Sequence, residues 1–212
     1  MSPDNAEGTG EGAGPKAARE LLIDRQLPRF DAHSFSALIV DADTEQSYRA
    51  VRALDPEQVA ASVPFMRLMG QARALPARLA SRHRDDGAPA EDALSAEQAG
   101  QAFLPLDEEP GVEFVVGMIG KFMSPTQLEF RRFQPAEFVG FTEPGYGKVA
   151  VDFLVLPYGS TRSLLCTETR TATTDPVSDR RFRTYWAVIG PFAGYIMRHW
   201  LTLAKQHAEH RF

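Results

Sequence analysis

Apolar and polar residues alternate in short runs along most of this chain, and then give way to a long stretch in which apolar residues recur every three or four positions. The first pattern is typical of half-buried strands and the second of a helix with one apolar side. The alternating runs predict six strands, near residues 33–41, 103–108, 112–121, 128–133, 148–156 and 163–171. Two pairs of them form hairpins, around Glu109-Pro110-Gly111 and Tyr158-Gly159-Ser160.

One long helix is predicted at the end of the sequence, from Asp175-Pro176 almost to Phe212. Asp is a favoured N-cap residue, and Pro suits the first helical position. Pro191 lies inside the helical pattern and predicts a kink, which either widens the space against the sheet or only fits the helix to the sheet's curvature. A single stripe along the helix consists of Phe182, Tyr185, Trp186, Ile189, Phe192, Ile196, Trp200 and Leu203.

Shorter helical patterns cover residues 44–54, where Asp43 or Thr44 is the cap, and residues 135–141. A helical insertion is predicted at about residues 55–99, interrupted by prolines. The insertion either covers the mouth of a cavity as a lid or packs on the edge of the sheet. The insertion also carries a basic patch, which is either a solvated helix face or a surface that attracts anionic groups. The patch consists of Arg67, Arg73, Arg78, Arg82 and Arg84.

Length and composition narrow the classes of protein that fit this pattern. The chain has 212 residues, which suits a single domain at 19–212 behind an acidic, glycine-rich tail at 1–18 that predicts disorder. The net charge of −5 argues against general nucleic-acid binding, and no apolar run reaches the roughly 18 residues of a membrane span. Cys166 is the only cysteine, so an internal disulfide is excluded and a cytoplasmic location is expected. The oligomeric state stays open.

The residues of the last predicted hairpin fall on two faces, one with odd and one with even residue numbers, because successive strand residues point to opposite sides. We expect the odd-numbered face to point inward, toward the final helix. The even-numbered face is expected to meet solvent, and it carries Lys148, Ala150, Asp152, Leu154, Cys166, Glu168 and Arg170. The threonines on the inward face fit either core packing, which is the commoner case, or the wall of a ligand pocket. The predicted cavity is lined by Val151, Phe153, Leu165 and Thr167 on the sheet, and by Trp186, Ile189, Phe192 and Ile196 on the helix.

Three residues are candidates for acid–base chemistry: Glu113, Tyr146 and His199. Glu113 lies in a predicted strand and qualifies only if its side chain points inward, because burial would then raise the pKa of its carboxyl group. Histidines 207 and 210 have no third ligand beside them, so no metal site and no cofactor are expected. Cys166 is assigned to the outward face without a histidine partner, which argues against a nucleophile.

Several segments together resemble bacterial SRPBCC proteins of the START/Bet v 1-like superfamily, including polyketide cyclase-like members. The resemblance spans roughly residues 20–210 and rests on segments 113–122, 138–146, 167–170 and 181–191, together with the order of the predicted elements. It implies an α+β helix-grip fold, in which a curved antiparallel sheet wraps a C-terminal helix with a cavity between them. None of the catalytic motifs of the cyclases can be placed on this chain, and the predicted insertion is longer than the helix pair of the basic fold.

Two classes of function fit these expectations. The first is a protein that binds a small hydrophobic molecule, lipid- or polyketide-like, between the sheet and the last helix. The second is a cyclase- or dehydratase-type enzyme that uses the same cavity and needs one of the acid–base candidates inside it. An interaction module whose cavity is filled by its own side chains is a third possibility. In all three cases we expect no binding to nucleic acid and no integral association with a membrane.

Overall fold

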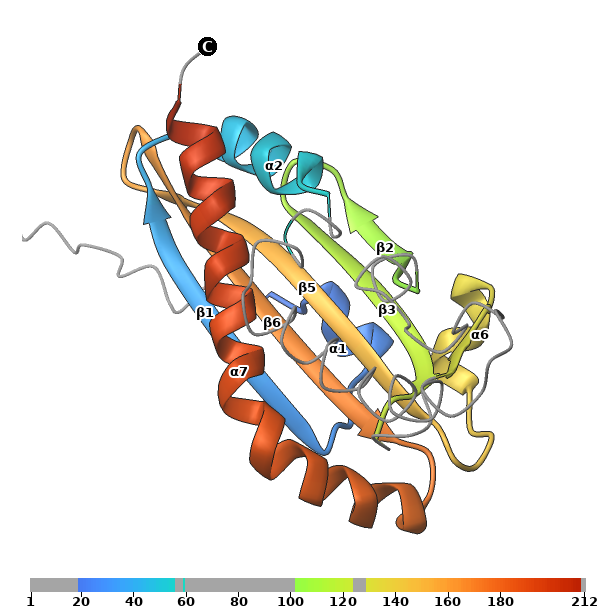
Figure 1. Cartoon of the computed structure of the whole chain (residues 1–212). Helices are drawn as coiled ribbons and strands as arrows, with labels where there is room; N and C mark the ends of the chain where they lie inside the picture. The colour runs from blue at the N-terminus through green and yellow to red at the C-terminus, as the bar shows by residue number, and fades with distance from the viewer. Residues whose placement is uncertain (1–18, 56–58, 60–101, 124–128, 211–212) are drawn as a thin grey trace, which may run out of the picture.

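The structure is a computed structural model, and it describes residues 19–55, 59, 102–123 and 129–210. The described chain contains four helices and six strands (Figure 1). Their order is α1 (Leu22–Gln26), β1 (Ala32–Val40), α2 (Thr44–Ala53), β2 (Leu104–Glu109), β3 (Glu113–Lys121), β4 (Glu129–Arg131), α6 (Pro135–Gly140), β5 (Gly147–Tyr158), β6 (Arg162–Thr173) and α7 (Pro176–Glu209).

All six strands join one antiparallel sheet in the order β1-β6-β5-β3-β2, with β4 paired to the end of β3. The predicted strands and both predicted hairpins are confirmed. In the β2–β3 turn, Gly111 has φ of 82°, and the Val112 N–H donates to the carbonyl of Glu109 at 3.0 Å. Positive φ at the third turn position is what a type II turn requires, which explains Pro110-Gly111 there.

Helix α7 has 34 residues and lies across one face of the sheet, with α2 beside its C-terminal part (Figure 1). The predicted cap is confirmed, since the Asp175 carboxylate accepts from the backbone N–H groups of Val177 and Ser178 at 2.9 and 3.0 Å. Pro191 lies within the helix, which bends along its length in Figure 1, in agreement with the predicted kink.

Replacing Asp175 with alanine is expected to lower the free energy of unfolding by about 1–2 kcal/mol, because the first turn of α7 loses its side-chain acceptor. The same carboxylate also accepts from the Gly145 N–H at 2.6 Å, which ties the loop before β5 to the helix. Urea unfolding measures the loss. The control is Asp179→Ala, which removes an ion pair with the exposed Arg183 and an acidic charge of the first turn but no cap, and is expected to cost less than about 1 kcal/mol. Equal losses in both variants would contradict the assignment.

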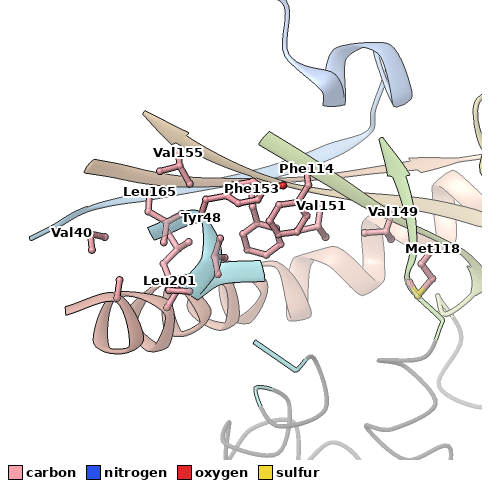
Figure 2. Packing of buried hydrophobic residues seen from close by; sticks show 14 of the residues in the cluster. Val40, Tyr48, Phe114, Met118, Val149, Val151, Phe153, Val155, Leu165 and Leu201 are labelled. Carbon is pink, nitrogen blue, oxygen red and sulfur yellow. The ribbon is translucent and has the colours of Figure 1, made fainter. Parts of the chain in front are cut away.

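Both faces of the sheet are covered over β3 and β5 and most of β6, and this corrects one expectation. The odd positions of β5 and β6 pack under α7 and α2, as expected (Figure 2). Most of the even positions are buried and not exposed to solvent: Ala150, Leu154 and Cys166 are only 0, 7 and 5% exposed, while Lys148 and Glu168 are half-buried. The physical reason is a second apolar cluster in which α1 and the segment around α6 cover this face through Leu22, Ile23, Leu27, Phe133 and Phe138. We call this side of the sheet the α1 face and the opposite side the α7 face.

The α+β class and the arrangement of a curved antiparallel sheet against one long C-terminal helix are therefore confirmed. The predicted tail at 1–18 lies outside the described residues. So does almost all of the predicted insertion at 55–99, with its possible lid and basic patch. Within the described part of the chain, no helix is long and apolar enough to cross a membrane.

Candidate ligand-binding site

The sheet residues of the predicted cavity all lie on the α7 face and are closely packed. Val151, Phe153, Leu165 and Thr167 are 5, 2, 0 and 1% exposed. On the helix, Trp186 and Ile196 are half-buried, and the Trp186 ring lies 5.5 Å from that of the buried Phe182. Ile189 and Phe192 belong to α7, but their side chains fall outside the described structure.

Four buried polar atoms on the α7 face have no hydrogen-bond partner among the described residues. They are Ser34 Oγ, Thr167 Oγ1, Thr169 Oγ1 and Trp200 Nε1. Strand pairing and one ring contact place these atoms on the same part of the α7 face. Ser34 is opposite Thr169 across the β1–β6 pair, Thr167 is opposite Phe153 across β5–β6, and the Trp200 ring lies 5.4 Å from the Phe153 ring. Because a buried polar group without a partner costs free energy, these atoms mark a place suited to a polar group from elsewhere.

One end of the α7 face is filled by aromatic packing. The Phe114 ring stacks on Phe153 at 5.0 Å and meets the edge of Tyr48, from α2, at 5.8 Å (Figure 2). The Tyr48 hydroxyl donates to Glu108, and burial followed by this hydrogen bond raises the pKa of Tyr48 to about 12. This end is core. The unpartnered atoms begin beside it, where Trp200 meets Phe153.

The three acid–base candidates lie in three different places. Glu113 is fully buried on the α1 face, where its carboxylate accepts from the Leu22 N–H and from Arg19. Tyr146 is buried in the cluster of the α1 face, and its hydroxyl donates to Glu129 at 2.9 Å. His199 is half-buried on α7, and its ring stacks on the exposed ring of Tyr195 at 6.3 Å. The structure therefore does not bring the candidates together.

A buried acid cluster occupies the α1 face, and sequence reasoning missed it. Asp152 is 2% exposed, and its pKa rises to about 8 because of burial first and then the neighbouring Glu113 charge. Arg170, also buried, forms ion pairs with Glu168 at 2.7 Å and with Asp24 of α1 at 2.8 Å. The signal was present in the sequence, since acidic and basic residues share the even positions of the last hairpin. Parity alone predicts a solvent-exposed face, because nothing in the pattern shows that α1 covers it.

Cys166 lies next to this cluster and is buried. Burial raises the pKa of its thiol to about 11, and the Asp152 charge adds to the effect. The thiol therefore stays protonated near neutral pH, which does not support a nucleophile. Among the described residues, no group of three or more histidine, cysteine, aspartate or glutamate side chains could hold a metal ion.

No family model matches this chain, and no curated protein matches its sequence. Solved structures with a similar fold include a hypothetical protein from Helicobacter pylori, at 9% identity and TM-score 0.42, covering 92% of this chain and 99% of that one. A conserved protein from Geobacillus kaustophilus aligns at 7% identity and TM-score 0.39, covering 84% and 95%. The Zhui aromatase/cyclase from a Streptomyces species aligns at 13% identity and TM-score 0.33, covering 84% and 93%. These similarities concern the course of the backbone and assign no family, ligand or activity to the chain.

Proposed function

We propose that this protein binds a small, mainly apolar molecule between the α7 face of the sheet and helix α7. The observation that carries the proposal is the set of four unpartnered polar atoms on a buried, otherwise apolar face. A ligand that brings a hydrogen-bonding group to them would remove part of the cost of leaving them unpaired.

The residue types on this face indicate the chemistry of the ligand. An indole N–H is only a donor, whereas a threonine or serine hydroxyl both donates and accepts. Trp200 Nε1 with the Thr167 and Thr169 hydroxyls therefore suits an acceptor such as a carbonyl or ether oxygen. The inward positions of β1, β3, β5 and β6 carry no charged residue, so a neutral molecule fits this face better than an ion.

The alternative, a cyclase- or dehydratase-type enzyme in the same space, requires a proton-transfer group close to the ligand. Glu113 and Tyr146 lie in the α1-face environment instead. His199 lies on α7 against Tyr195. Binding is thus the function that the geometry supports best, and catalysis is a proposal that rests on His199 alone.

Prodan, a neutral naphthalene ketone whose emission shifts to the blue in apolar surroundings, tests the proposed function. The chain has two tryptophans, Trp186 and Trp200, and both lie on α7. Bound prodan is expected to show saturable blue-shifted emission and to quench both tryptophans by energy transfer. Native mass spectrometry of protein purified from its own host would then reveal any natural ligand, as a mass that is lost on denaturation.

Thr167→Val and Thr169→Val remove hydroxyls from the α7 face while keeping the side-chain shape. Each is expected to weaken prodan binding by about two- to tenfold, the range of one net hydrogen bond. Thr202→Val is the matched control, since that hydroxyl is exposed on α7 and donates to the Arg198 carbonyl at 2.9 Å. Saturable prodan binding that ignores both sheet variants, or the absence of binding together with no host-derived mass, would refute the proposal.

A further inference from the structure

A concave site lies on the α1 face, away from the proposed ligand-binding site. A pocket of about 250 Å³ opens between the segment that follows α1, the end of α6 and the adjoining ends of β5 and β6. Its apolar walls include Leu27, Val139, Phe141 and Ala172. Two cationic residues, Arg29 and Lys148, also line it, and the side chains placed around the pocket include no carboxylate.

Lys148 is held at the pocket without being neutralised. Its ammonium donates to the carbonyls of Phe138 and Val139 at 3.2 and 3.1 Å, near the C-terminal end of α6. An ammonium has three N–H donors, so one is left over after these two bonds. Burial lowers the pKa of this half-buried lysine. Among the described residues, no carboxylate lies within ion-pair distance of it.

Arg29 adds a second cation at the pocket, and its side chain is exposed. No ion pair connects it to a described acid, although arginines elsewhere, such as Arg131 and Arg183, have carboxylate partners. The next acid in the sequence, Asp31, is already bound by the backbone N–H and the hydroxyl of Thr173 at 2.7 and 2.8 Å. The pocket is thus a local concentration of positive charge on a chain whose net charge is −5.

We propose that this pocket binds a small organic monocarboxylate with an aromatic or branched apolar body. The carboxylate accepts the free N–H of Lys148 and the guanidinium of Arg29, which are charge-assisted hydrogen bonds. The apolar body lies against Phe141, Leu27 and Val139. The size of the pocket is just below the roughly 300–1,000 Å³ of sites for drug-sized ligands, which limits the ligand to a small acid. Apolar walls favour an organic acid over inorganic phosphate. This site is separate from the proposed one on the α7 face.

Benzoate is the probe that tests this site, with benzamide as its neutral counterpart and inorganic phosphate as an anion without an apolar body. In ¹H–¹⁵N spectra of the full chain, benzoate at millimolar concentrations is expected to give saturable shifts of the Val139, Phe141, Thr142 and Lys148 amides. Benzamide and phosphate are expected to leave these amides unchanged. Shifts confined to the α7 face, or a stronger response to phosphate than to benzoate, would overturn the assignment.

Three variants decide whether the two cations hold the carboxylate. Arg29→Gln and Lys148→Met are each expected to weaken benzoate binding about tenfold, the loss of one charge-assisted hydrogen bond. Arg180→Gln, which removes an exposed charge from α7, is the matched control and is expected to have no effect. Because Lys148 also fastens α6, its variant is compared only if its amide spectrum shows a folded protein. Arg29 is exposed, so its variant alone suffices, and unchanged benzoate affinity in Arg29→Gln refutes the proposal.

Discussion

Replacing Asp152 with asparagine is expected to raise the free energy of unfolding at pH 8. In the native protein this free energy is expected to fall between pH 4 and pH 8, and the substitution should remove most of that fall. The pKa of Asp152 rises from its ordinary 3.8 to about 8 in the folded protein, because the group is buried and lies beside Glu113 and Glu168. The folded protein therefore keeps a proton on Asp152 over a range of pH in which the unfolded chain has lost it.

The direction of the effect follows from the protons bound in each state. Below pH 4 both states carry the proton, and Asp152 imposes no penalty. Between pH 4 and pH 8 only the folded state does, so stability falls with rising pH, by at most about 1.4 kcal/mol per pH unit for one proton. Above pH 8 both states have lost it, and the penalty is complete. Asparagine has no proton to lose, and its amide can donate to Glu113 at every pH.

Urea unfolding of the native protein and of Asp152→Asn, repeated from pH 4 to pH 9, measures this difference directly. Asp41→Asn is the control, because Asp41 is exposed and its substitution changes the same chemical group outside the cluster. The two stability profiles are expected to converge at pH 4 and to separate as the pH rises. Parallel profiles for the native protein and Asp152→Asn would show that the carboxyl group ionises normally.

Replacing Arg170 with methionine is expected to destabilise the protein by about 2–3 kcal/mol, less than the roughly 3–5 kcal/mol for a fully buried ion pair, because its partners Asp24 and Glu168 are 41 and 16% exposed. Arg170 is 7% exposed, and its charge lowers the pKa of the buried Asp152 on the α1 face. It pairs with Asp24 and Glu168, and it donates to the Leu27 carbonyl at 3.2 Å. Methionine fills similar space but leaves these acceptors without their donor.

The loss should fall first on the contact between α1 and the sheet. Hydrogen exchange is expected to speed up at the Leu22 and Leu27 amides, which donate to the Glu113 carboxylate and the Ile23 carbonyl, before it does so in β5 and β6. Arg183→Met is the matched control, since Arg183 pairs with Asp179 on the exposed side of α7 and its removal is expected to cost less than about 1 kcal/mol. If Arg170→Met and Arg183→Met unfold at similar urea concentrations, the ion pairs under α1 contribute little to stability.

The sequence predicted the elements well because each has a local signal. The period of α7, the cap at Asp175 and the turn at Pro110-Gly111 all depend on neighbouring residues, and the structure confirms all three. What covers the second face of the sheet depends on α1, which has five residues and is held by contacts with strands far along the chain. Such a short helix has little intrinsic stability, so its periodicity alone could not reveal its role.

In the candidate site, too, the sequence predicts what depends on local pattern and misses what depends on contacts between distant residues. Parity placed Thr167 and Phe153 on one face correctly, because strand geometry fixes the side on which each residue points. Parity alone could not say which face of β3 Glu113 would join, since that depends on the register of β3 against β5. The unpartnered state of Trp200 Nε1 also depends on packing between α7 and the sheet, which lies beyond any local pattern.

The position of β1 in the sheet has a consequence for the order of folding. The β5–β6 hairpin closes locally, whereas β1 reaches its partner only after β6 has been made, since Leu38 pairs with Leu165. Closing so long a loop costs entropy, and contacts between distant parts of a sequence form slowly. During synthesis, the apolar segment Leu38-Ile39-Val40 therefore leaves the ribosome early and waits for most of the chain to follow. A nascent chain halted before β6 would leave this strand exposed, as a natural target for a chaperone.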